Sequence, residues 1–277
     1  MAKANSSRKI GAIIALVLVI CAAVALGYLL GTKQGKTDTT PETTIAAEAT
    51  VAPTAEVKAE ATIAPTPVQT LEPGVNPAVG SKILFGTYPK SYGDEDGLPI
   101  QWLVIANDGE KALLLSSYVL DAQPFNTEFV NTTWENCTLR AWLNDDFYNR
   151  AFSEADKAYI VQTTVAAEAN PDYDADPGND TQDNVFILSV REAQKYFLTD
   201  AARSCFATEY AIAQCEFLTD NQSANLAQGF YWWLRTPGGG FGDCATMVLS
   251  DGSVNTGAYS VNSPSYGVRP AVWVRIS

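Results

Sequence analysis

The sequence predicts an α+β domain that follows a membrane-spanning helix and an extended stalk. Residues 10–31 carry no charge, residues 32–80 are rich in Thr, Ala, Pro and Glu, and all six tryptophans lie beyond residue 81. Within residues 81–277, strand-like segments lie mostly at the two ends and helical patterns lie between them. Such a separation of strands from helices is typical of the α+β class.

We expect residues 10–31 to span the membrane once, because a helix of this length measures about 33 Å, close to the thickness of a bilayer core. A cleaved signal peptide would have a shorter apolar stretch and a cleavage site between small residues, which "LGYLLGTK" lacks. A lipoprotein signal ending at Cys21 would need a small residue where Ile20 stands. The sequence therefore favours an uncleaved anchor over both alternatives.

The basic residues around the anchor predict its orientation. Three of them lie in residues 1–9, and only Lys33 and Lys36 follow the anchor closely, before a long acidic region. Because positive flanks stay inside, we expect residues 1–9 in the cytoplasm and residues 81–277 outside the cell. The sequence thus predicts a single-pass type II protein of the cell membrane, with the lipid bilayer as its partner through residues 10–31.

Residues 32–80 are expected to form a disordered stalk. They include the repeat "AEATVAPT" at 47–54 and "AEATIAPT" at 59–66, and they hold almost no large apolar residue. No hydrophobic core can form from this composition, and its prolines favour extended segments. The stalk would hold the outer domain on the order of 100 Å from the membrane.

The first half of the outer domain predicts a hairpin followed by helices. Runs rich in β-branched and aromatic residues indicate strands, "NDGE" indicates a turn, and apolar residues at helical spacing indicate a helix that Asn136 or Thr138 caps. Ser153 and Asp156 suit a capping box. The segments are strands at 82–88, 100–106 and 111–117, and helices at 138–152 and 153–160.

The second half predicts a return to strands. Ser189 and Glu192 suit a second capping box, which would open a helix after a buried strand. The segments are a strand at 185–189, helices at 190–197 and near 208–217, and strands at 230–235, 244–250, 252–255 and 267–276. Trp232 and Trp233 should point to opposite faces of their strand, one in the core and one partly exposed.

Composition excludes several functions. The part beyond the anchor carries 15 basic and 31 acidic residues, a net charge of −16, so we exclude nucleic acid and anionic lipid as partners. The chain has no histidine, which excludes His-based nucleophilic catalysis and His-ligated metals. Four cysteines, Cys137, Cys205, Cys215 and Cys244, follow the anchor; they form either disulfides or buried free thiols.

The outer domain contains several longer motifs, among them "KALLLSSYVLDAQPFN", "TTWENCTLRAWLNDDFYNRAFSEADKAYI", "YWWLRTPG" and "GVRPAVWV". Together these motifs resemble an uncharacterised domain family that recurs in surface proteins of Gram-positive gut bacteria. More distantly, "WLRTPGGG…SDGS…GVRPAVWV" is similar to the end of the formylglycine-generating-enzyme and C-type-lectin-like fold. That resemblance implies a face of irregular loops that presents ligands. Cys244 lacks the second cysteine that the oxidases of that group use, which argues against a copper oxidase.

The C-terminal segment holds the candidate ligand-binding residues. Loop 255–267 combines Tyr, Ser and Asn, which suit adaptable recognition, although a plain surface connection would look the same. We expect Trp233 and the tyrosines to stack on a ligand, and Arg235 and Arg269 to support the loop from behind. The predicted set is Trp233, Arg235, Asp243, Asp251, Tyr259, Asn262, Tyr266 and Arg269.

The segment "DYDADPGNDTQD" is a candidate calcium loop. Its carboxylates stand at EF-hand-like positions, namely Asp172, Asp174, Asp176, Asp180 and Asp183. Pro177 replaces the usual glycine, and Asp183 replaces the usual bidentate glutamate. An acidic surface loop without metal is the alternative.

The sequence as a whole favours a membrane-anchored domain that binds an extracellular glycan, peptide or cell-wall component. Two alternatives stay open at this point. One is an enzyme, either an oxidase relative or a carboxylate-based hydrolase, and the other is a structural protein of the envelope.

Overall fold

The computed structural model describes residues 68–276 apart from 73, 92, 94–96, 216–217, 219–225, 227 and 240–241. The predicted anchor at 10–31 and most of the predicted stalk lie outside this range. Within it, no helix is both long enough and apolar enough to cross a bilayer. The described residues belong to one unit, Thr66–Ser277.

This unit begins earlier than the sequence predicts. Strand β1 (Gln69–Thr70) pairs in parallel with β2 (Lys82–Tyr88), and the side chain of Leu71 joins the core. The amide of Gly80 donates to the carbonyl of Val104. The described residues from 69 to 80 therefore belong to the fold and not to the stalk, because strand pairing, the buried Leu71 and the hydrogen bond of Gly80 attach them to the sheet.

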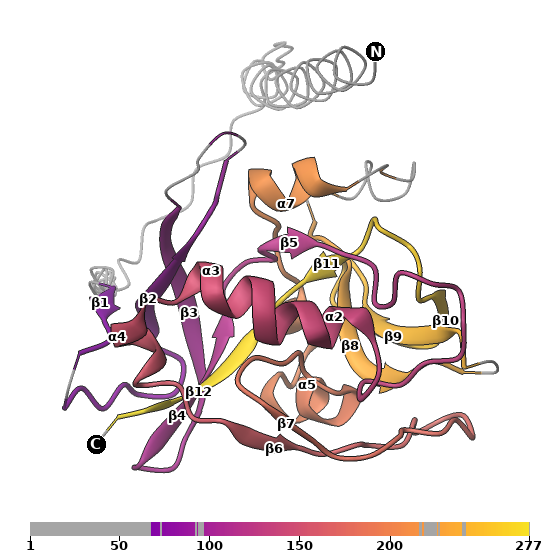
Figure 1. Cartoon of the computed structure of the whole chain (residues 1–277), viewed down its shortest axis with the longest axis horizontal. Helices are drawn as coiled ribbons and strands as arrows, with labels where there is room; N and C mark the ends of the chain where they lie inside the picture. The colour runs from indigo at the N-terminus through magenta and orange to yellow at the C-terminus, as the bar shows by residue number, and fades with distance from the viewer. Residues whose placement is uncertain are drawn as a thin grey trace, which may run out of the picture. The chain divides into compact units, whose positions relative to one another are not determined.

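The first sheet has the order β1-β2-β3-β4-β12. Its other members are β3 (Leu98–Asn107), β4 (Lys111–Ser116) and β12 (Ala271–Arg275). The predicted strands 82–88, 100–106 and 111–117 are confirmed, as is the turn between the last two. The C-terminal strand completes this sheet beside β4, so the first and last strands of the domain form opposite edges of one sheet (Figure 1).

The second sheet has the order β10-β9-β8-β11-β5. Its strands are β5 (Asp121–Ala122), β8 (Trp232–Pro237), β9 (Cys244–Val248), β10 (Val254–Ser260) and β11 (Gly267–Val268). Two predictions need correction. Strand β10 runs to Ser260, so half of the predicted loop 255–267 is strand, and the predicted strand 267–276 is divided at Arg269–Pro270. Proline has no amide to donate, and here the chain passes from the second sheet to the first.

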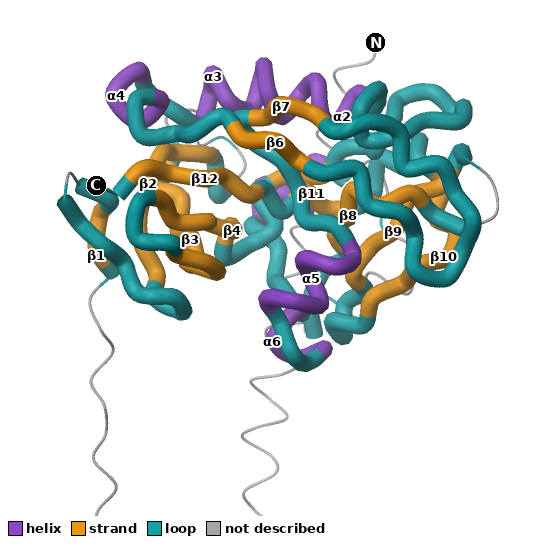
Figure 2. Tube along the Cα trace, turned by 90° about the horizontal axis from the view of Figure 1, so that it is seen from below, coloured by secondary structure: helices purple, strands orange, loops and turns teal. Residues whose placement is uncertain are grey.

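Helices cover the two sheets. One continuous helical segment contains α2 (Thr138–Trp142), the π-helical turn η1 (Leu143–Phe147) and α3 (Tyr148–Ala151), and it runs across both sheets (Figures 1 and 2). On the other side lie α5 (Val190–Tyr196) and α6 (Asp200–Arg203) (Figure 2). The remaining elements are α4 (Glu154–Lys157), α7 (Glu209–Gln214) and the ribbon of β6 (Thr163–Val165) with β7 (Thr181–Asp183).

The helix starts agree in part with the capping predictions. Both predicted capping boxes form, Ser153 with Asp156 and Ser189 with Glu192. The cap of α2 is neither Asn136 nor Thr138 but Cys137, whose sulfur accepts a hydrogen bond from the amide of Arg140 at 3.4 Å. The mixed α+β class predicted from the sequence is confirmed.

Candidate functional site

A surface pocket of about 350 Å³ lies where three loops meet. The loops are 129–137, which leads into α2; 166–180, which joins β6 to β7; and 237–243, which joins β8 to β9. We refer to this site as the three-loop pocket. Its described lining is mostly polar, and consists of Asn131, Thr132, Thr133, Asn136, Asp174, Ala175, Asp176, Pro237 and Gly242.

Glycines allow the three loops to approach each other closely. The ring of Tyr173 lies 2.5 Å from where a Cβ on Gly239 would stand, and the Cγ of Asn131 lies 2.9 Å from that position on Gly242. Such distances leave no room for a side chain. Gly239 and Gly242 therefore serve as backbone on which Tyr173 and Asn131 from the other two loops pack.

Hydrogen bonds hold the loops in these positions. The buried amide of Asn170 donates to the carbonyls of Pro237 at 2.7 Å and Thr256 at 2.9 Å, and its Oδ1 accepts from the amides of Asp172 and Tyr173. The amide of Thr132 donates to the carbonyl of Gly242 at 2.8 Å. Because each loop is tied to a neighbour, the pocket is formed in advance of any ligand.

The five aspartates predicted as calcium ligands do not converge. Within the part of the chain that the structure describes, no three His, Cys, Asp or Glu side chains are grouped so that they could hold a metal ion. Asp172 accepts from the hydroxyl of Thr256 at 2.6 Å, and Asp180 accepts from the amide of Ala167 at 2.8 Å. These two carboxylates bind protein groups on different strands and loops, so the EF-hand-like spacing does not produce an EF-hand-like site.

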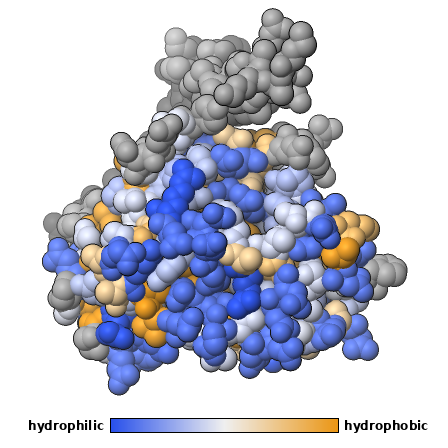
Figure 3. Space-filling model, viewed as in Figure 1, coloured by the Kyte–Doolittle hydropathy of each residue, from blue (hydrophilic) through white to orange (hydrophobic). Residues whose placement is uncertain are grey.

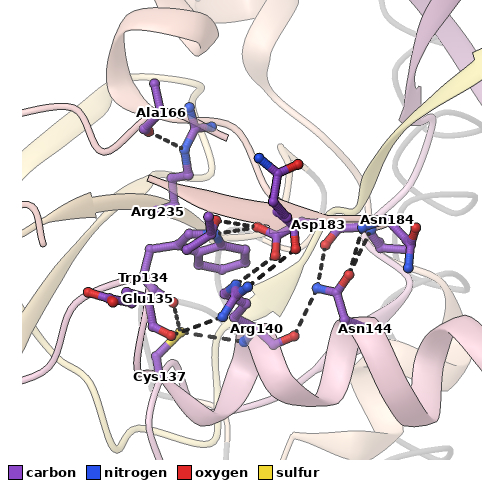
Figure 4. Close-up of polar contacts among 12 residues, drawn as sticks. Trp134, Glu135, Cys137, Arg140, Asn144, Ala166, Asp183, Asn184 and Arg235 are labelled. Carbon is purple, nitrogen blue, oxygen red and sulfur yellow. Dashed lines mark hydrogen bonds and ion pairs between the residues drawn. The ribbon is translucent and has the colours of Figure 1, made fainter. Parts of the chain in front are cut away.

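Asp183, the last of the five, is fully buried and belongs to the framework. Its carboxylate accepts from Nε of Arg140 at 2.6 Å, from the indole of Trp134 at 2.9 Å and from the hydroxyl of Thr181 at 2.7 Å (Figure 4). Beside it, Asn144 links helix and strand by accepting from the amide of Asn184 (Figure 4). This network attaches the helical segment to β7 at the base of the acidic loop.

Several predicted ligand residues are buried. Trp232 and Trp233 are both 0% exposed, so the prediction that one ring reaches the surface is wrong. The Trp233 indole donates to the carbonyl of Gln123. Both faces of β8 are covered, one of them by Phe125 and Tyr266, which contact Trp233.

Arg235 and Arg269 lie within the framework and are not among the described lining residues of the pocket. Arg235 pairs with Glu192 and donates to the carbonyl of Ile187 at 2.9 Å. Arg269 lies over the ring of Trp232 and donates to the carbonyl of Ser116 at 2.9 Å, and its burial lowers its pKa.

The predicted tyrosines form a half-buried aromatic cluster. Tyr266 contacts Tyr259 at a ring separation of 5.5 Å, Tyr231 at 6.1 Å and Trp233 at 5.0 Å. Desolvation raises the pKa of both Tyr259 and Tyr266. The neighbouring Asn262 is exposed and accepts from the hydroxyl of Ser260. This cluster is a surface distinct from the described lining of the three-loop pocket.

The last two predicted aspartates stabilise turns. Asp251 accepts from both the amide and the hydroxyl of Ser253, and these hydrogen bonds lower its pKa. Asp243 follows the pocket residue Gly242, and its carboxylate accepts from the thiol of Cys244 at 3.4 Å.

The four cysteines beyond the anchor are free and buried. Burial raises the pKa of Cys137 and of Cys215 to about 12 and that of Cys244 to about 11, and it raises the pKa of Cys205 as well. A nucleophilic cysteine requires a lowered pKa, so none of the four has the environment of a reactive thiolate.

Sequence reasoning missed the residues that line the pocket from loop 129–137. Asn131 and Asn136 stand in the polar stretch "NTTWEN", and Asn170 stands in "EANP". The available signal was a run of amide and hydroxyl side chains directly before a helix, a pattern that capping alone can also explain.

The face shown in Figure 3 is mostly hydrophilic, with hydrophobic residues in small separate patches.

The comparisons with known proteins identify a family. Residues 109–276, well over half of the chain, match one family, and this range includes the whole described lining of the pocket. No curated protein and no solved structure shows a significant match. The chain therefore belongs to the family described as Domain of unknown function (DUF6273).

Proposed function

We propose that this chain is a membrane-anchored recognition protein whose C-terminal domain binds a small polar ligand outside the cell in the three-loop pocket. The ligand would be part of a glycan, a peptide or another cell-wall component. The observation that carries the proposal is the convergence of three mutually fixed loops on a polar pocket. Its volume lies at the lower end of the range of about 300–1,000 Å³ for ligand sites.

The setting of this site stays part of the proposal. The uncharged stretch 10–31, the basic residues before it and the stalk favour an outward-facing domain on a single-pass anchor. The distant similarity to the C-type-lectin-like fold, and the likeness to surface proteins of Gram-positive bacteria, are in line with ligand presentation on loops. An oxidase is less well supported, because burial raises the pKa of Cys244.

The exposed aromatic ring beside the pocket also supports recognition. Tyr173 is 48% exposed and its ring rests on the backbone of Gly239. An aromatic ring held on rigid backbone offers contact area at little entropic cost. Sugar rings and peptide side chains both use such contacts.

Binding of the purified full-length chain to arrays of glycans and cell-wall fragments tests this function. Asn136→Ala removes an exposed pocket side chain and should weaken binding of any captured ligand roughly two- to twelvefold, since a lost hydrogen bond contributes about 0.5–1.5 kcal/mol. Asn149→Ala, on the exposed side of the helical segment, is the matched control and should bind as the wild type does. Binding that Asn136→Ala leaves unchanged would exclude the pocket as the site.

A further inference from the structure

The carboxylates of segment 172–183 divide into two groups. Asp172, Asp180 and Asp183 each accept a hydrogen bond from a residue at least 13 positions away, namely Thr256, Ala167 and Arg140. Asp174 has no hydrogen bond or ion pair with any described residue, and Asp176 accepts only from the amide of Gly178 at 3.0 Å. Asp174 and Asp176 are the two that line the pocket. The two acids that accept from no distant described residue are thus the two that line the pocket.

From this coincidence we infer that the three-loop pocket binds its ligand through a primary ammonium group. This inference rests on the proposed function and specifies its ligand class. Two carboxylates with open acceptor positions attract a cation, and the amide oxygens of Asn131 and Asn136 can accept the remaining N–H groups.

The surroundings of the pocket favour a cation over an anion. No Lys or Arg is among its described lining residues. The exposed ring of Tyr173, adjacent in sequence to Asp174, offers an aromatic face of the kind that attracts ammonium groups. The strong negative charge of the outer part would also repel anionic ligands.

A ligand of this chemistry has two sources outside a cell. One is an amino sugar whose nitrogen is not acetylated, and the other is a peptide side chain that ends in an amine. Both combine an ammonium group with nearby hydroxyl or amide groups, which the threonine and asparagine side chains of the pocket can bind.

The test titrates the full-length chain with matched probes at mildly acidic pH, where the amines are protonated, and follows binding by NMR. The sugar probes are methyl glucosaminide, methyl N-acetylglucosaminide and methyl glucoside. The peptide probes are Nα-acetyl-lysine amide and Nα-acetyl-norleucine amide. We expect at least one amine probe to bind more tightly than its neutral partner, and added salt to weaken only the amine probes.

Variants connect this preference to the two carboxylates. Asp174→Asn and Asp176→Asn should each weaken binding of the amine probe roughly 1.4- to fivefold, the range for exposed ion pairs. Asp146→Asn, an exposed aspartate on the helical segment with no described side-chain partner, should change nothing.

Preference for the glucosaminide assigns the ligand to a glycan, and preference for the lysine amide assigns it to a peptide. Equal binding of charged and neutral probes, no binding at tens of millimolar, or full binding by both aspartate variants would overturn the inference. Neutral ligands that Asn136→Ala weakens would overturn it while leaving the proposed function in place. Both the inference and the proposed function would be overturned if a ligand bound equally well to the wild type and to every pocket variant.

Discussion

The two ends of segment 172–183 use the same side chain in opposite ways. At the C-terminal end, Asp183 is fully buried and satisfied by Arg140, Trp134 and Thr181. Near the N-terminal end, Asp174 is exposed and has no described partner, although it lies on a wall of the three-loop pocket. The difference teaches that burial and partners, more than sequence spacing, decide whether a carboxylate holds the fold or faces a ligand.

Replacing Asp183 should have the largest effect on the stability of the domain. Asp183→Asn should destabilise the domain by about 3–5 kcal/mol, because it leaves the partly buried Arg140 without its charge partner. Urea unfolding of the full-length chain measures this change. A loss under about 1 kcal/mol would mean that the buried network is not what fastens the helical segment to β7.

A second buried carboxylate gives a pH-dependent effect. Asp121 is 2% exposed and accepts from the hydroxyl of Tyr88, and burial raises its pKa from 3.8 to about 6. The folded state therefore holds this proton more tightly than the unfolded state. The contribution of this raised pKa to the free energy of unfolding is therefore fully present below about pH 4 and is lost as the pH rises through about 6.

Asp121→Asn should remove this pH dependence. Between about pH 4 and pH 7, the free energy of unfolding of the variant should fall by on the order of 2–3 kcal/mol less than that of the wild type. Urea unfolding at a series of pH values checks it. Parallel curves for variant and wild type would show that Asp121 titrates normally.

The aromatic cluster should respond according to the number of ring contacts. Tyr266→Ala removes contacts with three rings and should cost about 1–2 kcal/mol, whereas Tyr259→Ala removes one and should cost about half as much. Thermal unfolding compares the two variants. If Tyr259 contacts the ligand as the sequence predicts, Tyr259→Ala should reduce the free energy of binding by more than it reduces the free energy of unfolding. Unchanged ligand binding would mean that the cluster is purely structural.

Loss of the Asp172 carboxylate should have only a small effect on stability. It is exposed and makes one hydrogen bond, to Thr256. Asp172→Asn should therefore cost no more than about 0.5–1 kcal/mol. A larger loss in urea unfolding would place Asp172 with Asp183 among the residues that hold the fold.

Much of the fold could be predicted because its signals are local. The hairpin around "NDGE" and the capping boxes at Ser153 and Ser189 depend on residues within a few positions of each other. Their partners lie inside the same segment, so the sequence contains the whole interaction.

The site could be predicted only in part, because its residues contact side chains that are far away in the sequence. All five aspartates of "DYDADPGNDTQD" look alike in sequence, and Asp183 is distinguished by Arg140, 43 residues away. Trp233 was expected to be partly exposed, since nothing local shows that Phe125 and Tyr266 cover it. The break at Pro270 likewise has meaning only once two sheets are present.

The most direct test of the central claim measures stability and binding together in the double variant Asp174→Asn, Asp176→Asn. If these carboxylates face a ligand and do not hold the fold, the unfolding free energy should stay within about 0.5 kcal/mol of the wild type. Binding of the preferred amine probe should fall at least about twofold, as two exposed ion pairs are lost. A loss of several kcal/mol with unchanged binding would contradict the account.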